Sequence, residues 1–78
     1  MSEPQLAERE LTALDLERAI DTREVSAILG TSAVTLAQWR LRGEGPPFFK
    51  AGTRSVRYRL GDVLAWRDAR MAGKRDVA

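Results

Sequence analysis

At 78 residues the chain is long enough for one small domain, and a domain near this size buries only about 60% of its unfolded surface. It contains no cysteine and no histidine, which excludes disulfides and removes the commonest metal ligand and general base. We therefore expect no enzyme, no metal and no other cofactor. The formal net charge is only +2.

The charges are unevenly distributed along the chain. Residues 1–30 hold three arginines and seven acidic residues, whereas residues 31–78 hold ten lysines and arginines and four acidic residues. A basic second half is what a phosphate-binding surface needs, although an ordinary solvated surface can carry the same charge.

No apolar run approaches the roughly 20 residues of a membrane span, and the first residues do not resemble a signal peptide. We expect a soluble, intracellular protein that binds no membrane.

Residues 1–20 form an N-terminal extension. Its leucines have a partly helical spacing, which predicts a helix over residues 5–19, and Pro4 is suited to a first helical turn. The extension packs on the domain, contacts another protein or frays, and the pattern leaves these alternatives open.

Residues 21–72 form the main domain, which begins with two short helices. Thr22 is suited to cap the first helix, whose apolar residues Val25, Ile28 and Leu29 share one face, and Gly30 ends it. Thr31 or Ser32 can cap the second helix. Two short helices joined by a glycine-containing turn are typical of a helix-turn-helix, although such pairs also occur in proteins that bind no DNA.

A compact hairpin and a third helix follow. The segment from Gly43 to Pro47 cannot continue a helix, and residues 48–51 and 55–60 read as two strands around Gly52-Thr53-Arg54. The last helix is expected from Gly61-Asp62 to about Met71, with Gly73 ending it and residues 73–78 forming a basic flexible tail. The expected fold is mainly α with a small β-hairpin: a winged helix-turn-helix with an extra N-terminal helix.

The aromatic residues can be read either as a stacking platform for single-stranded nucleic acid or as core. Their places on apolar faces favour the core. The residues that we expect in the core are Val25, Leu29, Leu36, Trp39, Tyr58, Leu64 and Trp66.

The chain resembles the small winged helix-turn-helix proteins of the excisionase and AlpA group, which are related to the DNA-binding head of MerR regulators. The resemblance covers about residues 21–68. It rests on the Leu29-Gly30-Thr31-Ser32 turn, Trp39 with Arg42-Gly43, the Pro46-Pro47 entry to the wing, and the closing run from Asp62 to Trp66.

The resemblance implies that the second helix is the recognition helix and that the hairpin is a wing. It makes Ser32, Thr35, Gln38 and Arg42 candidate DNA contacts from the helix, and Thr53, Arg54, Ser55 and Arg57 candidates from the wing. Side-chain chemistry adds Arg40, which can pair with guanine or phosphate, and Lys50 in the same basic stretch. Relatives often have long polar side chains where this chain has Ala33 and Ala37.

The resemblance further implies a bacterial or phage excisionase, a recombination directionality factor that binds double-stranded DNA cooperatively, bends it and directs an integrase toward excision. The charge split suggests self-association on DNA, head to tail or as a filament. A small AlpA-type transcriptional regulator and a packaging or segregation adaptor are alternatives. A protein-interaction adaptor that has lost DNA binding is an alternative of another class.

Overall fold

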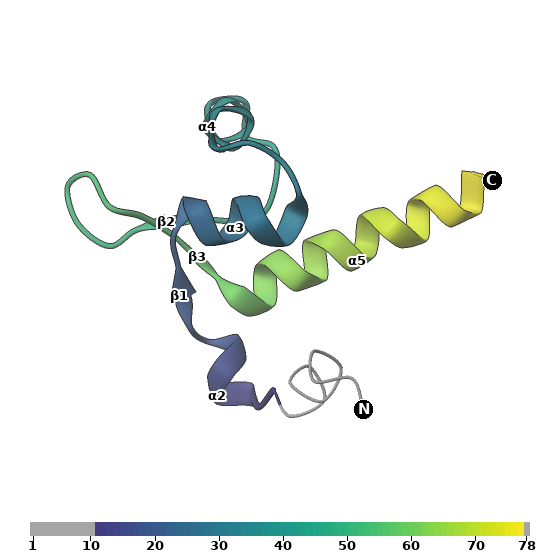
Figure 1. The fold of residues 1–78 in the computed structure, drawn as a ribbon, viewed down its shortest axis with the longest axis horizontal. Coiled ribbons are helices and arrows are strands. Elements are labelled where there is room, and N and C mark those ends of the chain that lie inside the picture. The colour runs from purple at the N-terminus through teal and green to yellow at the C-terminus, as the bar shows by residue number, and fades with distance from the viewer. Residues whose placement is uncertain (1–10, 78) are drawn as a thin grey trace.

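The computed structural model describes the backbone of residues 11–77 and the side chains of residues 11–71. Figure 1 shows the short helices and the small sheet gathered toward the start of the long C-terminal helix. The elements are α2 (Ala13–Leu16), β1 (Ala19–Ile20), α3 (Thr22–Leu29), α4 (Ala33–Arg42), β2 (Phe49–Lys50), β3 (Val56–Arg59) and α5 (Leu60–Val77). This mainly helical fold with a small antiparallel sheet is compatible with a winged helix-turn-helix, as predicted.

The two helices α3 and α4 begin and end at residues with strong local preferences. Asp21 caps α3 in a capping box with Glu24, so the expected cap at Thr22 is wrong by one residue. Gly30 ends α3 in the left-handed conformation, at a φ of 67° that glycine adopts without strain. Ser32 caps α4 by accepting a hydrogen bond from the backbone N–H of Thr35. The chain therefore turns between the two helices instead of continuing as one rod.

The sheet contains a strand that the sequence did not predict. β1 and β2 both pair antiparallel with β3, so that the strand order is β1-β3-β2. Ile20 lies opposite Tyr58, and Phe49 lies opposite Arg57. The expected hairpin is confirmed, with Ala51–Ser55 as the connecting loop closed by a hydrogen bond from the backbone N–H of Ala51 to the carbonyl of Ser55.

The expected helix over residues 5–19 is wrong within the described residues. Helix α2 covers only Ala13–Leu16, and the chain is extended by Ala19, while residues 5–10 lie outside the described part. The physical reason is tertiary: Ile20 is buried in the core, and pairing with β3 keeps its backbone extended. Residues 13–20 are thus built into the domain, with α2 packed against α5.

The core lies between the sheet and the helices. Its fully buried apolar residues are Ile20, Val25, Leu36, Tyr58 and Val63. Leu29 and Trp39 are partly buried against this cluster. Trp66 is half-buried and packs against Trp39, with the ring centroids 5.4 Å apart and the ring planes tilted by 44°. Leu64 is only half-buried, because α5 points Val63 into the core instead.

The C-terminal helix is longer than expected. It begins at Leu60, directly after β3, and continues through Gly73 to Val77, so the expected helix end at Gly73 is wrong. A single glycine inside a helix costs only about 1 kcal/mol relative to alanine, which a long helix can tolerate. The side chains of Lys74 and Arg75 lie outside the described residues.

Candidate nucleic-acid interface

Helix α4 presents fewer polar groups to solvent than its sequence predicts. Gln38 and Arg42 are exposed, and Arg42 lies 3.7 Å from a carboxylate oxygen of Glu44. The hydroxyls of Ser32 and Thr35 are engaged with each other, with Ser32 Oγ 3.0 Å from Thr35 Oγ1, as part of the helix cap. Gln38 and Arg42 are therefore the exposed candidate recognition residues of α4 whose functional groups take no part in the cap of the helix.

Arg40 faces the interior side of α4. Its Nη1 atom donates a hydrogen bond of 2.7 Å to the hydroxyl of Tyr58, and the guanidinium lies 5.8 Å from the ring centroid of Phe48. The guanidinium is thus oriented toward β3 and the wing entry, and one of its five N–H donors is committed to Tyr58. The sequence does not predict this hydrogen bond, because Tyr58 lies 18 residues further along the chain and only the folded sheet brings it beside Arg40.

The wing carries the cations that project into solvent. Lys50, Thr53 and Arg54 are exposed, and the β2–β3 loop extends from the sheet at the end of the molecule opposite the C-terminal end of α5 (Figure 1). Ser55 and Arg57 are half-buried, and Arg57 Nη1 donates a hydrogen bond of 2.8 Å to the Val56 carbonyl. Lys50 and Arg54 are thus the most accessible charged groups of this hairpin.

Arg59 is neutralised by two carboxylates. Its guanidinium lies 2.9 Å from Glu17 on one side and 2.7 Å from Asp62 on the other. The hydrogen bond from Arg59 holds the pKa of Glu17 below its ordinary value, and Glu17 in turn raises the pKa of Arg59 further above its already high value. These ion pairs make Arg59 a structural link between the N-terminal segment and the start of α5.

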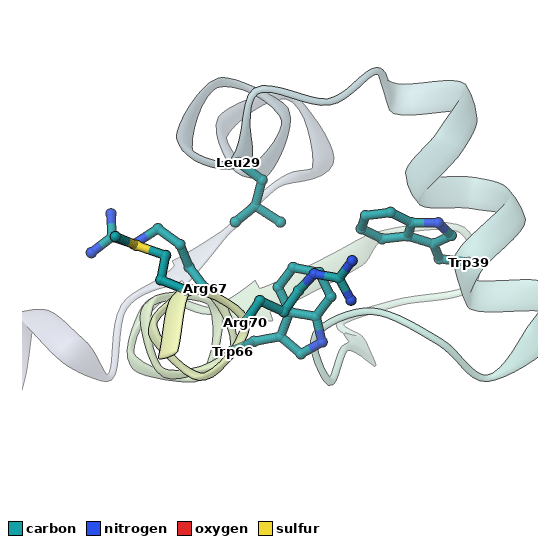
Figure 2. A pocket seen from close by; sticks show the side chains of 6 residues that line it. Leu29, Trp39, Trp66, Arg67 and Arg70 are labelled. Carbon is teal, nitrogen blue, oxygen red and sulfur yellow. The ribbon is translucent and has the colours of Figure 1, made fainter. Parts of the chain in front are cut away.

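Two shallow grooves flank α4. One lies between α4 and the wing, has a volume of about 360 Å³, and is lined by Ala37, Arg40, Leu41, Phe48, Lys50 and Val56. The other, of about 270 Å³, lies between α4 and α5, where Figure 2 shows Leu29, Trp39 and Trp66 around a hollow with Arg67 and Arg70 at its rim. Arg70 lies 4.7 Å from the ring centroid of Trp66. Within residues 11–71 no group of carboxylates is arranged to hold a metal ion.

A family model described as a helix-turn-helix domain matches residues 20–71, which is most of the chain. The chain belongs to the helix-turn-helix family of the excisionase and AlpA type. No curated protein is similar enough to match the chain. The matched range begins at Ile20, the buried residue of β1, and includes α3, α4, the wing and the start of α5. A helix-turn-helix domain indicates DNA binding.

The helix-turn-helix domain also has features that the sequence reasoning did not single out. Val34 and Leu41 are 68% and 88% exposed on α4, and both lie on its outer face with Gln38. Their spacing of i, i+4 and i+7 was visible in the sequence and could have identified an apolar stripe on the side opposite Leu36.

In the described part of the chain, no helix is long and apolar enough to span a membrane.

Proposed function

We propose that the protein binds double-stranded DNA specifically, with α4 in the major groove and the β2–β3 wing at the adjacent backbone or minor groove, and that it acts as an excisionase of a phage or mobile element. In this role it has no catalytic step of its own. It binds side by side with further copies, bends the DNA and directs an integrase toward excision. The protein works in the cytoplasm of the bacterial host.

The placement of accessible groups on α4 and the wing is the observation that carries this proposal. Gln38 and Arg42 are exposed on α4, and Lys50 and Arg54 are exposed on the hairpin that follows it. Charged groups on a wing and the N-terminus of a helix can contact phosphates, and side chains in the groove can contact bases. Half-buried Arg57 and Ser55 and exposed Thr53 are further candidate wing contacts.

A domain this small contacts few base pairs, so a single copy has modest specificity. Several copies on repeated sites raise occupancy because neighbouring binding events support one another. The acidic N-terminal part and the basic second half supply opposite charges for contacts between neighbours.

The binding test is a titration of a fluorescent duplex, measured by anisotropy at low and at physiological salt. If about six phosphates are engaged, the logarithm of the affinity falls with a slope of about −5 against the logarithm of salt concentration. An affinity that does not respond to salt contradicts the proposed phosphate contacts. A competition with single-stranded DNA separates groove binding from stacking on bases.

Excision is tested separately from binding. Footprinting on DNA flanking the gene shows site length, repeat spacing and whether occupancy spreads, and an excision assay with the neighbouring integrase measures the reaction. Stimulation of excision supports the directionality role. Binding without stimulation, together with altered expression of a reporter driven by the bound region, supports an AlpA-type regulator instead.

The alternative of another class, a protein-interaction adaptor, is favoured by one observation. The outer face of α4 is apolar at Val34 and Leu41, which is uncommon for a helix that only contacts a polar groove. Absence of duplex binding even at low salt would support the adaptor.

A further inference from the structure

We infer that the outer face of α4 reads A·T base pairs through the methyl groups of thymine, with Val34 and Leu41 as the apolar contacts and Gln38 between them. This inference rests on the proposed DNA binding and names the base-pair class that the same helix prefers.

The first step is the arrangement of the three side chains. Val34, Gln38 and Leu41 follow one another at i, i+4 and i+7, which places them along one stripe of the helix. Val34 and Leu41 are 68% and 88% exposed, on the face opposite the buried Leu36. Single exposed apolar residues are common on protein surfaces and need no explanation. Two of them on the helix face that a helix-turn-helix presents to DNA do need one.

The second step concerns the polar groups that remain on this helix. Ser32 and Thr35 are engaged in the cap, and Arg40 is held by Tyr58. Arg42 is the last residue of α4 and lies beside Glu44. Among the described central residues of the stripe, Gln38 alone offers both a donor and an acceptor.

The third step is the chemistry of the groove. Thymine is the base that presents a methyl group in the major groove, and aliphatic side chains contact it favourably. Glutamine forms a pair of hydrogen bonds with N6 and N7 of adenine. Both interactions select the same base pair, whereas guanine is read chiefly by arginine or lysine, which the stripe lacks.

The surroundings of the stripe favour DNA as its occupant over an apolar protein segment. Lys50 lines the groove that also contains Leu41 and Phe48, and Arg42 lies one residue from Leu41 on α4. Cations beside an apolar strip complement a groove whose floor carries methyl groups and whose edges carry phosphates.

The experiment removes only the thymine methyl groups from the DNA and leaves the protein unchanged. A duplex selected by the chain from a random pool is prepared once with thymine and once with deoxyuridine, which keeps the same pairing edge. We expect binding to weaken about fourfold for each contacted methyl group, which corresponds to about 0.8 kcal/mol per buried carbon at 1.4 kcal/mol per tenfold. The selected sites should be rich in A·T pairs.

Variants then assign the effect to α4. The double variant Val34→Ala and Leu41→Ala should bind the two duplexes with equal affinity, because the side chains that contact the methyl groups are gone. Leu14→Ala is the matched control: Leu14 is 81% exposed but lies on α2, and its removal should leave the preference for thymine unchanged. The base substitution itself needs no variant, so a folding defect in the double variant does not affect the main comparison.

The outcomes separate the two proposals. If the chain binds no duplex at low salt, the proposed DNA binding is wrong. If it binds a selected duplex but does not distinguish thymine from deoxyuridine, DNA binding stands and the methyl readout is wrong.

Discussion

Arg40 on α4 donates a 2.7 Å hydrogen bond to the hydroxyl of Tyr58 on β3, and this contact joins the second helix of the helix-turn-helix to the wing. Tyr58 is fully buried, so its hydroxyl needs a partner, and Arg40 supplies one from a helix 18 residues earlier in the chain. The same guanidinium lies over Phe48 at the entry to the wing. The orientation of the wing relative to α4 therefore depends on a residue that the sequence suggests for base contact.

Arg40→Ala should destabilise the fold. Removing a charged donor from the buried Tyr58 hydroxyl should lower the free energy of unfolding by about 1.5–3 kcal/mol. Urea denaturation followed by tryptophan fluorescence measures it. Arg42→Ala is the matched control on the same helix, and its exposed side chain should contribute less than about 0.5 kcal/mol. Equal losses for the two variants would contradict an interior role for Arg40.

Ile20→Ala should be among the most damaging substitutions, although Ile20 precedes the helix-turn-helix. Ile20 is fully buried between β3 and the helices, and loss of a buried isoleucine side chain costs about 2–5 kcal/mol. Thermal unfolding followed by circular dichroism checks the result. Leu14→Ala, at an 81% exposed site, should shift the midpoint little. A mild effect of Ile20→Ala would show that β1 is not part of the cooperative unit.

Gly45→Ala should destabilise the fold more than Gly43→Ala does. Both glycines have a positive φ, which costs an alanine about 1–2 kcal/mol. A Cβ at Gly45 would also lie 2.9 Å from Cε3 of Trp39, whereas one at Gly43 would meet no atom within 4 Å. Overpacking of this kind adds about 1–3 kcal/mol. The comparison of urea midpoints for the two variants tests the contact, and identical midpoints would be evidence against it.

Stability should fall in acid partly through Glu17. The pKa of Glu17 is lowered in the folded state by its hydrogen bond from Arg59, so its carboxylate stabilises the fold above the ordinary value of 4.5. This contribution is lost as the pH falls from 4.5 through the lowered folded pKa. Glu17→Gln should therefore flatten the acid side of the stability profile measured by urea denaturation. Glu44→Gln, on the loop before the wing, serves as the control, and a profile unaltered by Glu17→Gln would contradict the role of this ion pair.

Arg54→Ala should weaken DNA binding by a similar factor for all duplex sequences. Arg54 is exposed in the wing loop, where a guanidinium contacts phosphate more readily than bases. Loss of one phosphate contact reduces the steepness of the salt dependence by about 0.9. Anisotropy titrations over a series of salt concentrations measure both quantities. Arg59→Ala is the contrasting variant, because the Arg59 guanidinium is paired with Glu17 and Asp62. Its loss should lower the stability of the fold and leave the salt dependence of DNA binding unchanged.

The order of α3, turn, α4 and hairpin was predictable because each boundary depends on neighbours in sequence. Gly30 and Ser32 set the turn through a left-handed glycine and a helix cap, and the prolines after Gly45 exclude a continuing helix. Val25 and Leu36 followed from helical periodicity, which needs only a few adjacent turns. These interactions are local, so the residues that make them are visible in a single stretch of sequence.

The roles of Ile20, Arg40 and Arg59 were decided only by the tertiary structure. Ile20 lies in a strand because its backbone pairs with the edge of β3. Arg59 is neutralised by Glu17, which lies 42 residues earlier in the chain. The sequence alone does not distinguish an arginine that contacts solvent from one that binds a phosphate or a buried tyrosine hydroxyl. The role of an arginine depends on which groups the folded chain brings close to it, because a hydrogen bond requires a distance of about 3 Å and the attraction between charges weakens as they separate.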